Sequence, residues 1–184
     1  MLNSNCGEVG RCGRGSPQER WLQALLAAHP ALCTLAYWHH PRFSSGRHGG
    51  ETAVSAFWEA LYEHDAELVL AGHDHVYERF APQKPNGEPD PIRGIRQFVV
   101  GTGGKSLHES GRPPIANSEA RDDRTFGVLN LTLNAMSYDW RFVPVAGRTF
   151  TDSGSGSCHQ RRDPDATPRR RTLPNPDPWR RTFW

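Results

Sequence analysis

Two short apolar runs, each followed within four residues by a pair of histidines, constrain this 184-residue chain more than any other feature. The first run covers residues 32–38 (LCTLAYW) and the second covers residues 68–71 (LVLA). Continuous apolar runs of this length are typical of strands buried on both faces. Because prolines bound the first run on both sides, we expect it to be a short, central strand of a sheet.

Each apolar run is preceded by a segment with helical start signals. Ser16 is a good N-cap, Pro17 suits the first helical position, Glu19 completes a capping box, and Pro30 ends the segment. Thr52 is expected to cap the second helix. The resulting order of helix, strand, helix, strand predicts a layered α/β sheet.

The second half of the chain has a different pattern. Residues 125–134 and 135–145 alternate apolar and polar side chains, which predicts antiparallel strands joined by a tight turn. The last residues have many prolines and no periodicity, which predicts disorder. We therefore divide the chain into an α/β domain over residues 1–158 and a disordered, Arg/Pro-rich tail over residues 159–184.

The charge distribution and the apolar content give no indication of a nucleic-acid or membrane partner. The formal net charge is +2, but residues 160–184 hold seven arginines and three aspartates, so residues 1–159 are near −2. A basic tail spaced by prolines does not by itself indicate a nucleic-acid partner. No apolar stretch approaches the about 18 residues of a membrane span, and the N-terminus lacks the pattern of a signal peptide.

The four cysteines fit neither a redox pair nor a zinc ribbon. Cys6 and Cys12 bracket a glycine-rich loop and can form a disulfide, which would suit an oxidising compartment; free thiols are the alternative. Cys33 lies in the first apolar run, where we expect a free, buried cysteine that acts as a small hydrophobe.

The histidines that follow the two strands point to a metal site. Ligands of open α/β sheets bind outside the carboxyl ends of the strands, and adjacent parallel strands would place these histidines side by side. A His-x-His pair alone is more often part of a polar loop. Two strand ends that deliver histidine to one crevice favour a metal site, because neutral imidazole is the commonest metal ligand.

Two motifs resemble those of a known family. GHDHVYER (residues 72–79) resembles the Gly-His-x-His motif of calcineurin-like metallophosphoesterases, in the extended form typical of purple acid phosphatases. WHHPRFSSGRHG (residues 38–49) resembles the His-x-Pro motif that precedes it, with a further histidine nine residues on. The resemblance covers roughly residues 3–158. It implies the C-terminal half of an α/β/β/α sandwich.

The resemblance implies a role for four histidines. His39 and His73 match ligands of one metal ion, and His75 matches a ligand of the other ion of a two-metal centre. His48 matches a histidine that contacts the substrate phosphate and can protonate the leaving group. The ions would be iron, zinc or manganese, and the substrate a small phosphate ester clamped between them.

Neighbouring residues are expected to support the site without bonding a metal. His40 and Asp74 have no role in the family pattern and are placed beside the ligands, and Gly72 is expected to permit the tight turn between strand and histidines. Glu78 and Arg79 are expected to form an ion pair behind the site. The other histidines have no expected chemistry: His29, His64, His108 and His159.

The earlier motifs of the family, which supply the bridging aspartate and an asparagine ligand, are absent from this sequence. We therefore expect an exposed strand edge and a partner in the N-terminal half of the same domain. The expected function is metal-dependent hydrolysis of phosphate monoesters, with little or no activity in this chain alone. A metal-binding remnant without catalysis, and a phosphodiesterase or nucleotidase, are the alternatives. The resemblance also implies a secreted or cell-envelope protein.

Overall fold

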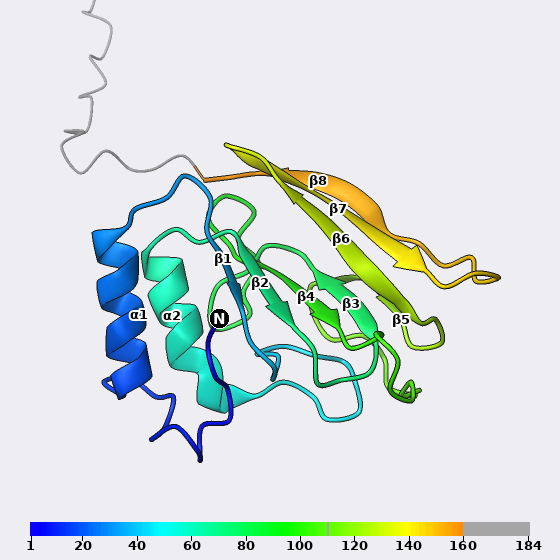
Figure 1. Ribbon diagram of the computed structural model, residues 1–184, viewed down its shortest axis with the longest axis horizontal. Helices are drawn as coiled ribbons and strands as arrows, with labels where there is room; N and C mark the ends of the chain where they lie inside the picture. Colours follow the sequence, from blue (N-terminus) through cyan, green and yellow to red (C-terminus); the bar gives the residue numbers. More distant parts are fainter. Residues whose placement is uncertain (110, 160–184) are drawn as a thin grey trace, which may run out of the picture.

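The structure is a computed structural model and describes residues 1–109 and 111–159. Figure 1 shows three layers: two helices, a five-stranded sheet and a three-stranded sheet. The helices are α1 (Pro17–Ala28) and α2 (Ser55–Glu63), the latter preceded by a 3-10 turn, η1 (Thr52–Val54). The strands of the larger sheet are β1 (Leu35–Tyr37), β2 (Leu68–Ala71), β3 (Tyr77–Phe80), β4 (Arg96–Val100) and β5 (Ser118–Asp122). The smaller sheet contains β6 (Gly127–Leu133), β7 (Ser137–Pro144) and β8 (Ser153–Ser157).

The larger sheet has the strand order β1-β2-β4-β3-β5. Strands β1, β2 and β4 are parallel, whereas β3 runs antiparallel to both β4 and β5. The smaller sheet is an antiparallel meander. The predicted fold class, an α-β-α-β unit followed by antiparallel strands, is therefore confirmed, and the described residues form three of the four layers of the implied sandwich.

The prediction of a central strand over residues 32–38 is wrong. Strand β1 covers three of these residues and lies at the edge of the sheet. Leu32 and Tyr37 are about half exposed, at 51% and 48%. On the side away from β2, the backbone N–H of Leu2 donates to the carbonyl of Tyr37 (3.0 Å). An apolar run indicates a strand, but it does not show how many neighbours pair with it.

The start of α1 follows the predicted capping with one difference. Ser16 Oγ accepts the N–H of Glu19 (3.2 Å), and Pro17 is the first helical residue. The Glu19 carboxylate accepts the N–H of Gly15 (2.8 Å), one residue before the expected donor. The expectation that Thr52 caps the second helix is wrong. The N-cap of α2 is Val54, which makes no side-chain cap, and the Glu51 carboxylate caps the preceding turn, η1, by accepting the N–H of Ala53 (2.8 Å).

The core lies in two layers on either side of the larger sheet. Side chains of α2, among them Phe57 and Trp58, pack against Val69 of β2. On the other face, Phe98 of β4 packs against Trp140 of β7. Apolar packing on both faces fixes the larger sheet between the helices and the smaller sheet.

A hydrogen-bonded carboxylate joins the two sheets. Asp152 accepts hydrogen bonds from the Tyr77 hydroxyl (2.6 Å), Arg79 Nε (2.7 Å) and Trp140 Nε1 (3.1 Å). Burial alone raises the pKa of Asp152, but the hydrogen bonds from Arg79 and Tyr77 outweigh it, so the net shift is downward. The ionised form of Asp152 therefore stabilises the contact between the sheets.

All four cysteines form disulfides. Cys6 bonds to Cys12, with their Cα atoms 5.2 Å apart, and Cys33 bonds to Cys158, with their Cα atoms 5.4 Å apart. The expectation that Cys33 is a free, buried cysteine is wrong. The second bond joins residues 125 positions apart, and spacing in the sequence contained no signal for it.

The predicted tail of residues 159–184 lies outside the described residues, apart from His159. Within the described part of the chain, no helix combines the length and the apolar character needed to cross a membrane.

Removing the disulfides should have unequal effects on stability. A disulfide stabilises mainly by restricting the unfolded chain, and more so for longer loops. Replacing Cys33 and Cys158 by serine should lower the free energy of unfolding by about 5 kcal/mol, against about 2 kcal/mol for Cys6 and Cys12. Urea denaturation of the two double variants measures this. A larger loss for the shorter loop would contradict the assignment.

Asp152→Asn should destabilise the protein by about 3 kcal/mol at pH 7, because it breaks a largely buried charged pair. Asp139→Asn, an exposed change on the same sheet, is the control. Because the folded-state pKa of Asp152 is depressed, its stabilisation is fully present above the ordinary carboxyl value of 3.8 and is lost as the pH falls through the folded-state pKa. The difference in urea midpoint between wild type and Asp152→Asn should therefore shrink below that pH. A constant difference would contradict the role of the ionised form.

Candidate metal centre

The pairing of β1 with β2 places two histidines together at the carboxyl ends of parallel strands. The backbone N–H of Trp38 donates to the carbonyl of Leu70 (3.2 Å), and the N–H of Gly72 donates to the carbonyl of His39 (3.0 Å). His39 and His73 thus leave the sheet from neighbouring strand ends, as the sequence predicts for a ligand site.

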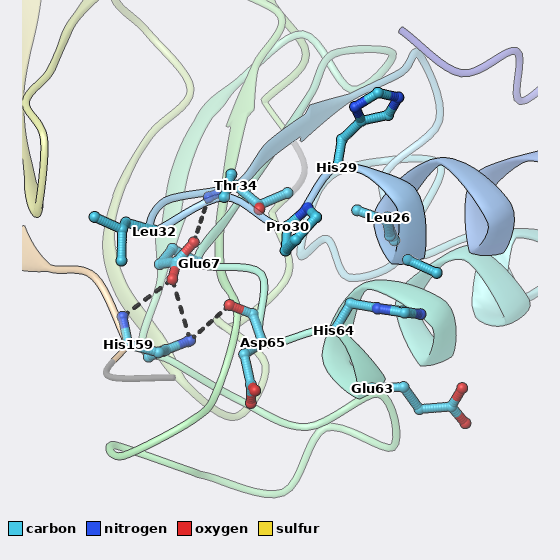
Figure 2. Close-up of a pocket in the computed structure, with 12 residues that line it drawn as sticks. Leu26, His29, Pro30, Leu32, Thr34, Glu63, His64, Asp65, Glu67 and His159 are labelled. Carbon is cyan, nitrogen blue, oxygen red and sulfur yellow. Dashed lines mark hydrogen bonds and ion pairs between the residues drawn. The ribbon is translucent and has the colours of Figure 1, made fainter. Parts of the chain in front are cut away.

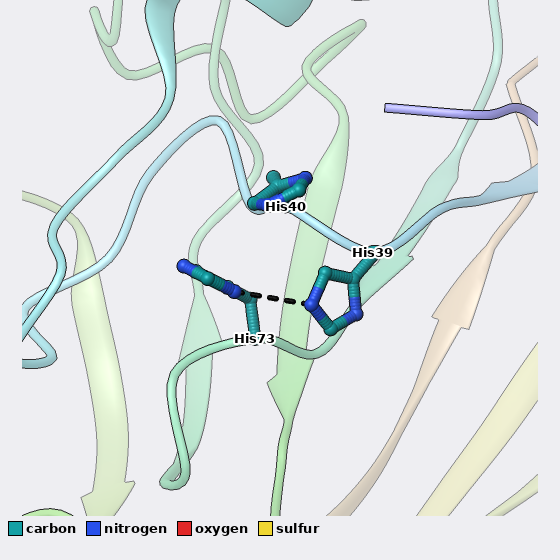
Figure 3. Close-up of side chains that lie close together, drawn as sticks. All are labelled: His39, His40 and His73. Atoms are coloured by element: carbon teal, nitrogen blue, oxygen red, sulfur yellow. Dashed lines mark hydrogen bonds between the residues drawn. The ribbon is translucent and has the colours of Figure 1, made fainter. Parts of the chain in front are cut away.

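Three imidazoles converge at this edge (Figure 3). His39 Nε2 lies 3.0 Å from His73 Nδ1, and His40 completes a group whose possible ligand atoms all lie within 4.8 Å of one another. Two nitrogens bound at 2.0–2.1 Å to one tetrahedral ion are roughly 3.3 Å apart. The observed spacing therefore fits a shared transition-metal ion after a small adjustment.

His40 is part of this group, whereas the sequence analysis placed it beside the ligands. Its Nδ1 lies 2.9 Å from the hydroxyl of Ser4, and its backbone N–H donates to the same hydroxyl (2.9 Å). Trp38 Nε1 donates to the His40 carbonyl (2.7 Å). These contacts fix the backbone and the Nδ1 edge of the ring, and leave Nε2 as the nitrogen available to an ion.

The turn that presents His73 differs from the expected one. Gly72 has no left-handed backbone, and a Cβ added there would meet nothing within 4 Å. His73 itself has a φ of 64°, in the left-handed region that side chains rarely adopt. The expectation that Gly72 permits the turn is therefore wrong. The unusual conformation falls on the candidate ligand.

The environment keeps the paired imidazoles neutral. Burial lowers the pKa of His39, and the neighbouring His40 and His75 lower it further. Burial also lowers the pKa of His73, followed by the effects of His40 and His48. Because a neutral ring nitrogen is the form that binds a metal ion, these shifts favour the ligand state near neutral pH.

His75 lies outside the group formed by His39, His40 and His73. Its Nδ1 lies 2.5 Å from the carbonyl oxygen of Ser106, which can only accept, so Nδ1 carries the proton and Nε2 is left for a ligand. Its ring stacks on His108, with 4.0 Å between centroids. Its assignment to a second ion stays a prediction.

Asp74 joins the two histidine segments. It is fully buried and accepts the Ser44 hydroxyl (2.5 Å) and the backbone N–H of His48 (2.9 Å). The His48 ring is exposed, with its centroid 4.6 Å from that of His73. This arrangement holds His48 at the rim of the centre.

The expected ion pair between Glu78 and Arg79 does not form. Successive residues of β3 point to opposite faces of the sheet. Glu78 is buried and accepts the hydroxyls of Ser45 (2.6 Å) and Ser118 (2.7 Å), which supports the loop behind the centre. Arg79 faces the smaller sheet and Asp152.

Sequence reasoning missed one histidine beside the centre. His108 follows β4, the third parallel strand, and lies against His48 and His75. The signal in the sequence for His108 was that it follows a third strand, β4, which is parallel to β1 and β2. A glycine-rich loop separates it from the strand, so its position could not be inferred from spacing.

A separate pocket of about 350 Å³ lies by the amino ends of β1 and β2 (Figure 2). Its buried carboxylate, Glu67, already accepts the N–H groups of Thr34 (2.5 Å) and His159 (3.0 Å). Burial raises the pKa of Glu67. This pocket lies at the opposite edge of the sheet from His39 and His73, and its central carboxylate already has hydrogen-bond partners. We therefore place the functional site at the carboxyl ends of β1 and β2.

Comparisons with known proteins bear on the fold and the family. No family model matches the chain. Purple acid phosphatase 21 of Arabidopsis thaliana is 37% identical over 95 residues, which is 48% of this chain and 21% of that protein. Purple acid phosphatase 15 of the same plant is 34% identical over 97 residues, which is 50% of this chain and 18% of that protein. The chain thus spans about a fifth of the length of these relatives.

Two solved structures share the fold. The purple acid phosphatase PPD1 from yellow lupin (Lupinus luteus) seeds has a TM-score of 0.65 at 23% identity, over 79% of this chain and 29% of that one. GAP50, described as the anchor in the inner membrane complex of Plasmodium, has a TM-score of 0.62 at 15% identity, over 79% of this chain and 42% of that one.

The strand order and these similarities give the chain a metallophosphoesterase-like fold that matches the C-terminal part of such a domain. Within that class the fold is purple acid phosphatase-like.

The turn of residues 72–76 should be sensitive to one glycine and insensitive to another. A Cβ on Gly101 would lie 2.0 Å from the carbonyl oxygen of Asp74, whereas Gly72 has open space around it. We expect Gly101→Ala to cost about 1–3 kcal/mol of stability through overpacking, and Gly72→Ala to cost less than about 0.5 kcal/mol. Urea denaturation measures both. Equal losses would contradict the described packing.

Proposed function

We propose that this chain is part of a two-metal phosphomonoesterase and supplies histidine ligands to its centre. The observation that carries the proposal is the 3.0 Å approach of His39 Nε2 to His73 Nδ1 at adjacent strand ends. Iron, zinc or manganese ions held there would supply Lewis-acid activation of a phosphate ester and of the attacking water. The residues of the chain would position the ions and handle the leaving group.

The number of ligands argues that residues 1–158, the proposed domain unit, do not form the centre alone. Within the described residues, His39, His40 and His73 can share one ion, whereas His75 belongs to neither group of potential ligands and would be a lone ligand of the proposed second ion. Stable sites normally have three or four protein ligands. We propose that donors from the N-terminal half of the same domain complete the centre, and that this chain alone is inactive or very weak.

His48 is the proposed general acid. Its backbone is fixed by Asp74, while its exposed ring lies near His73 and can meet a substrate at the rim. In that position the imidazolium would hold a proton for the departing alkoxide. Its role therefore depends on the loop geometry that the buried Asp74 maintains.

Two other functions share the same centre. A phosphodiesterase or nucleotidase would use the same ions with a different substrate pocket. A remnant that binds metal without catalysis is the other candidate. One structural neighbour with this fold is described as an anchor, so the fold alone does not imply hydrolysis.

We propose a secreted or cell-envelope location. The two disulfides are the supporting observation, since disulfides persist mainly in oxidising compartments.

The test is hydrolysis and phosphate binding by the purified 184-residue chain. With Mn²⁺, Zn²⁺ or Fe²⁺, hydrolysis of p-nitrophenyl phosphate should not exceed that of the His39→Ala/His73→Gly variant. Metal-dependent binding of orthophosphate should still be measurable by calorimetry, and His48→Ala should weaken it by about tenfold, equivalent to about 1.4 kcal/mol.

Two results would contradict the proposal in different ways. Hydrolysis that depends on His39 and His73 at the rate of a complete enzyme would show that no further donors are needed. Metal binding without any metal-dependent phosphate binding would favour the remnant. Comparison with bis(p-nitrophenyl) phosphate separates phosphomonoesterase from phosphodiesterase activity.

A further inference from the structure

A second group of potential ligand atoms lies outside the His39 group. His48, Asp74 and His108 come from three separate segments, and one nitrogen or oxygen of each lies within 4.8 Å of the other two. The group shares no residue with His39, His40 and His73. Its members meet because the loops after β1, β2 and β4 end at the same edge of the sheet.

Asp74 is a buried carboxylate without an ion-paired arginine or lysine among the described residues. Its carboxylate is fully buried and accepts two hydrogen bonds, from the Ser44 hydroxyl and the His48 N–H. Over residues 1–109 and 111–159, no arginine or lysine forms an ion pair with it. A carboxylate has about four lone-pair sites, so acceptor capacity remains. Burying a charge without a counter-charge is costly, and a bound cation would offset that cost.

His108 has a nitrogen without a partner. Its Nδ1 is buried and makes no hydrogen bond in the described structure. The ring is held in place by stacking on His75 and lies beside His48, with centroids 4.0 and 5.5 Å away.

We propose that His48, Asp74 and His108 form a separate site for a transition-metal ion of the zinc class. Two imidazole nitrogens and one carboxylate oxygen are a donor set that Zn²⁺ takes with a fourth position open to water. The buried charge of Asp74 favours a dication over a neutral ligand, and imidazole nitrogens favour zinc over calcium or magnesium.

The new site also has a consequence for the proposed function. An ion held by His48 would occupy the ring that is proposed to protonate the leaving group, so excess zinc would inhibit a complete enzyme. This consequence rests on the proposed function, whereas the binding of zinc does not.

Calorimetric titration of Zn²⁺ into the His39→Ala/His73→Gly variant at pH 7.5 tests the site without a contribution from the first group. We expect one ion per chain. Adding His108→Ala should weaken binding by at least about 100-fold, since loss of even an outer-shell partner costs 10–100-fold. Adding His29→Ala, a change at the exposed end of α1, should alter it by less than about threefold.

Two zinc-binding results would overturn the proposed site. If the double variant binds no zinc, or if His108→Ala binds it as tightly as its His29→Ala counterpart, the site does not exist. Should His108→Ala fail to give a folded circular-dichroism spectrum, His48→Ala replaces it with the same expected loss. Co²⁺ absorption gives an independent readout, because a tetrahedral nitrogen and oxygen site has an intense visible band that His108→Ala should abolish.

Discussion

The parallel pairing of β1 with β2 is the interaction on which the candidate centre depends. Two backbone hydrogen bonds at the ends of these strands, Trp38 to Leu70 and Gly72 to His39, bring the following loops together. Without this register, His39 and His73 would not lie within hydrogen-bond distance. Because β1 pairs with only one described strand, the centre depends on an edge strand of the sheet.

Buried carboxylates set the geometry around that pairing. Asp74 ties the loop after β1 to the turn after β2, and Glu78 holds the same loop from behind through Ser45. Asp152 connects the two sheets by accepting hydrogen bonds from Arg79 and Trp140. Each of these carboxylates accepts several hydrogen bonds, which compensate for the loss of water around a buried polar group. Asp152 is ion-paired with Arg79, whereas neither Asp74 nor Glu78 has an ion-paired arginine or lysine in the described part of the chain. Asp74 lies beside His48 and His108, where a metal ion can supply the positive charge.

The sequence predicted features that depend on local chemistry or strand period. The cap at Ser16, the buried run of β2 and the histidines after both strands all follow from short patterns. Features set by distant contacts could not be predicted. The edge position of β1, the bond of Cys33 to Cys158 and the approach of His108 each depend on segments far away in the chain.

The central claim is that the carboxyl ends of β1 and β2 hold a metal ion through His39 and His73. Anomalous diffraction at the zinc edge, from crystals of the chain soaked in Zn²⁺, tests it most directly. The account predicts a peak about 2.1 Å from both His39 Nε2 and His73 Nδ1. Density for both rings in the described positions, with zinc bound only elsewhere or not at all, would contradict it.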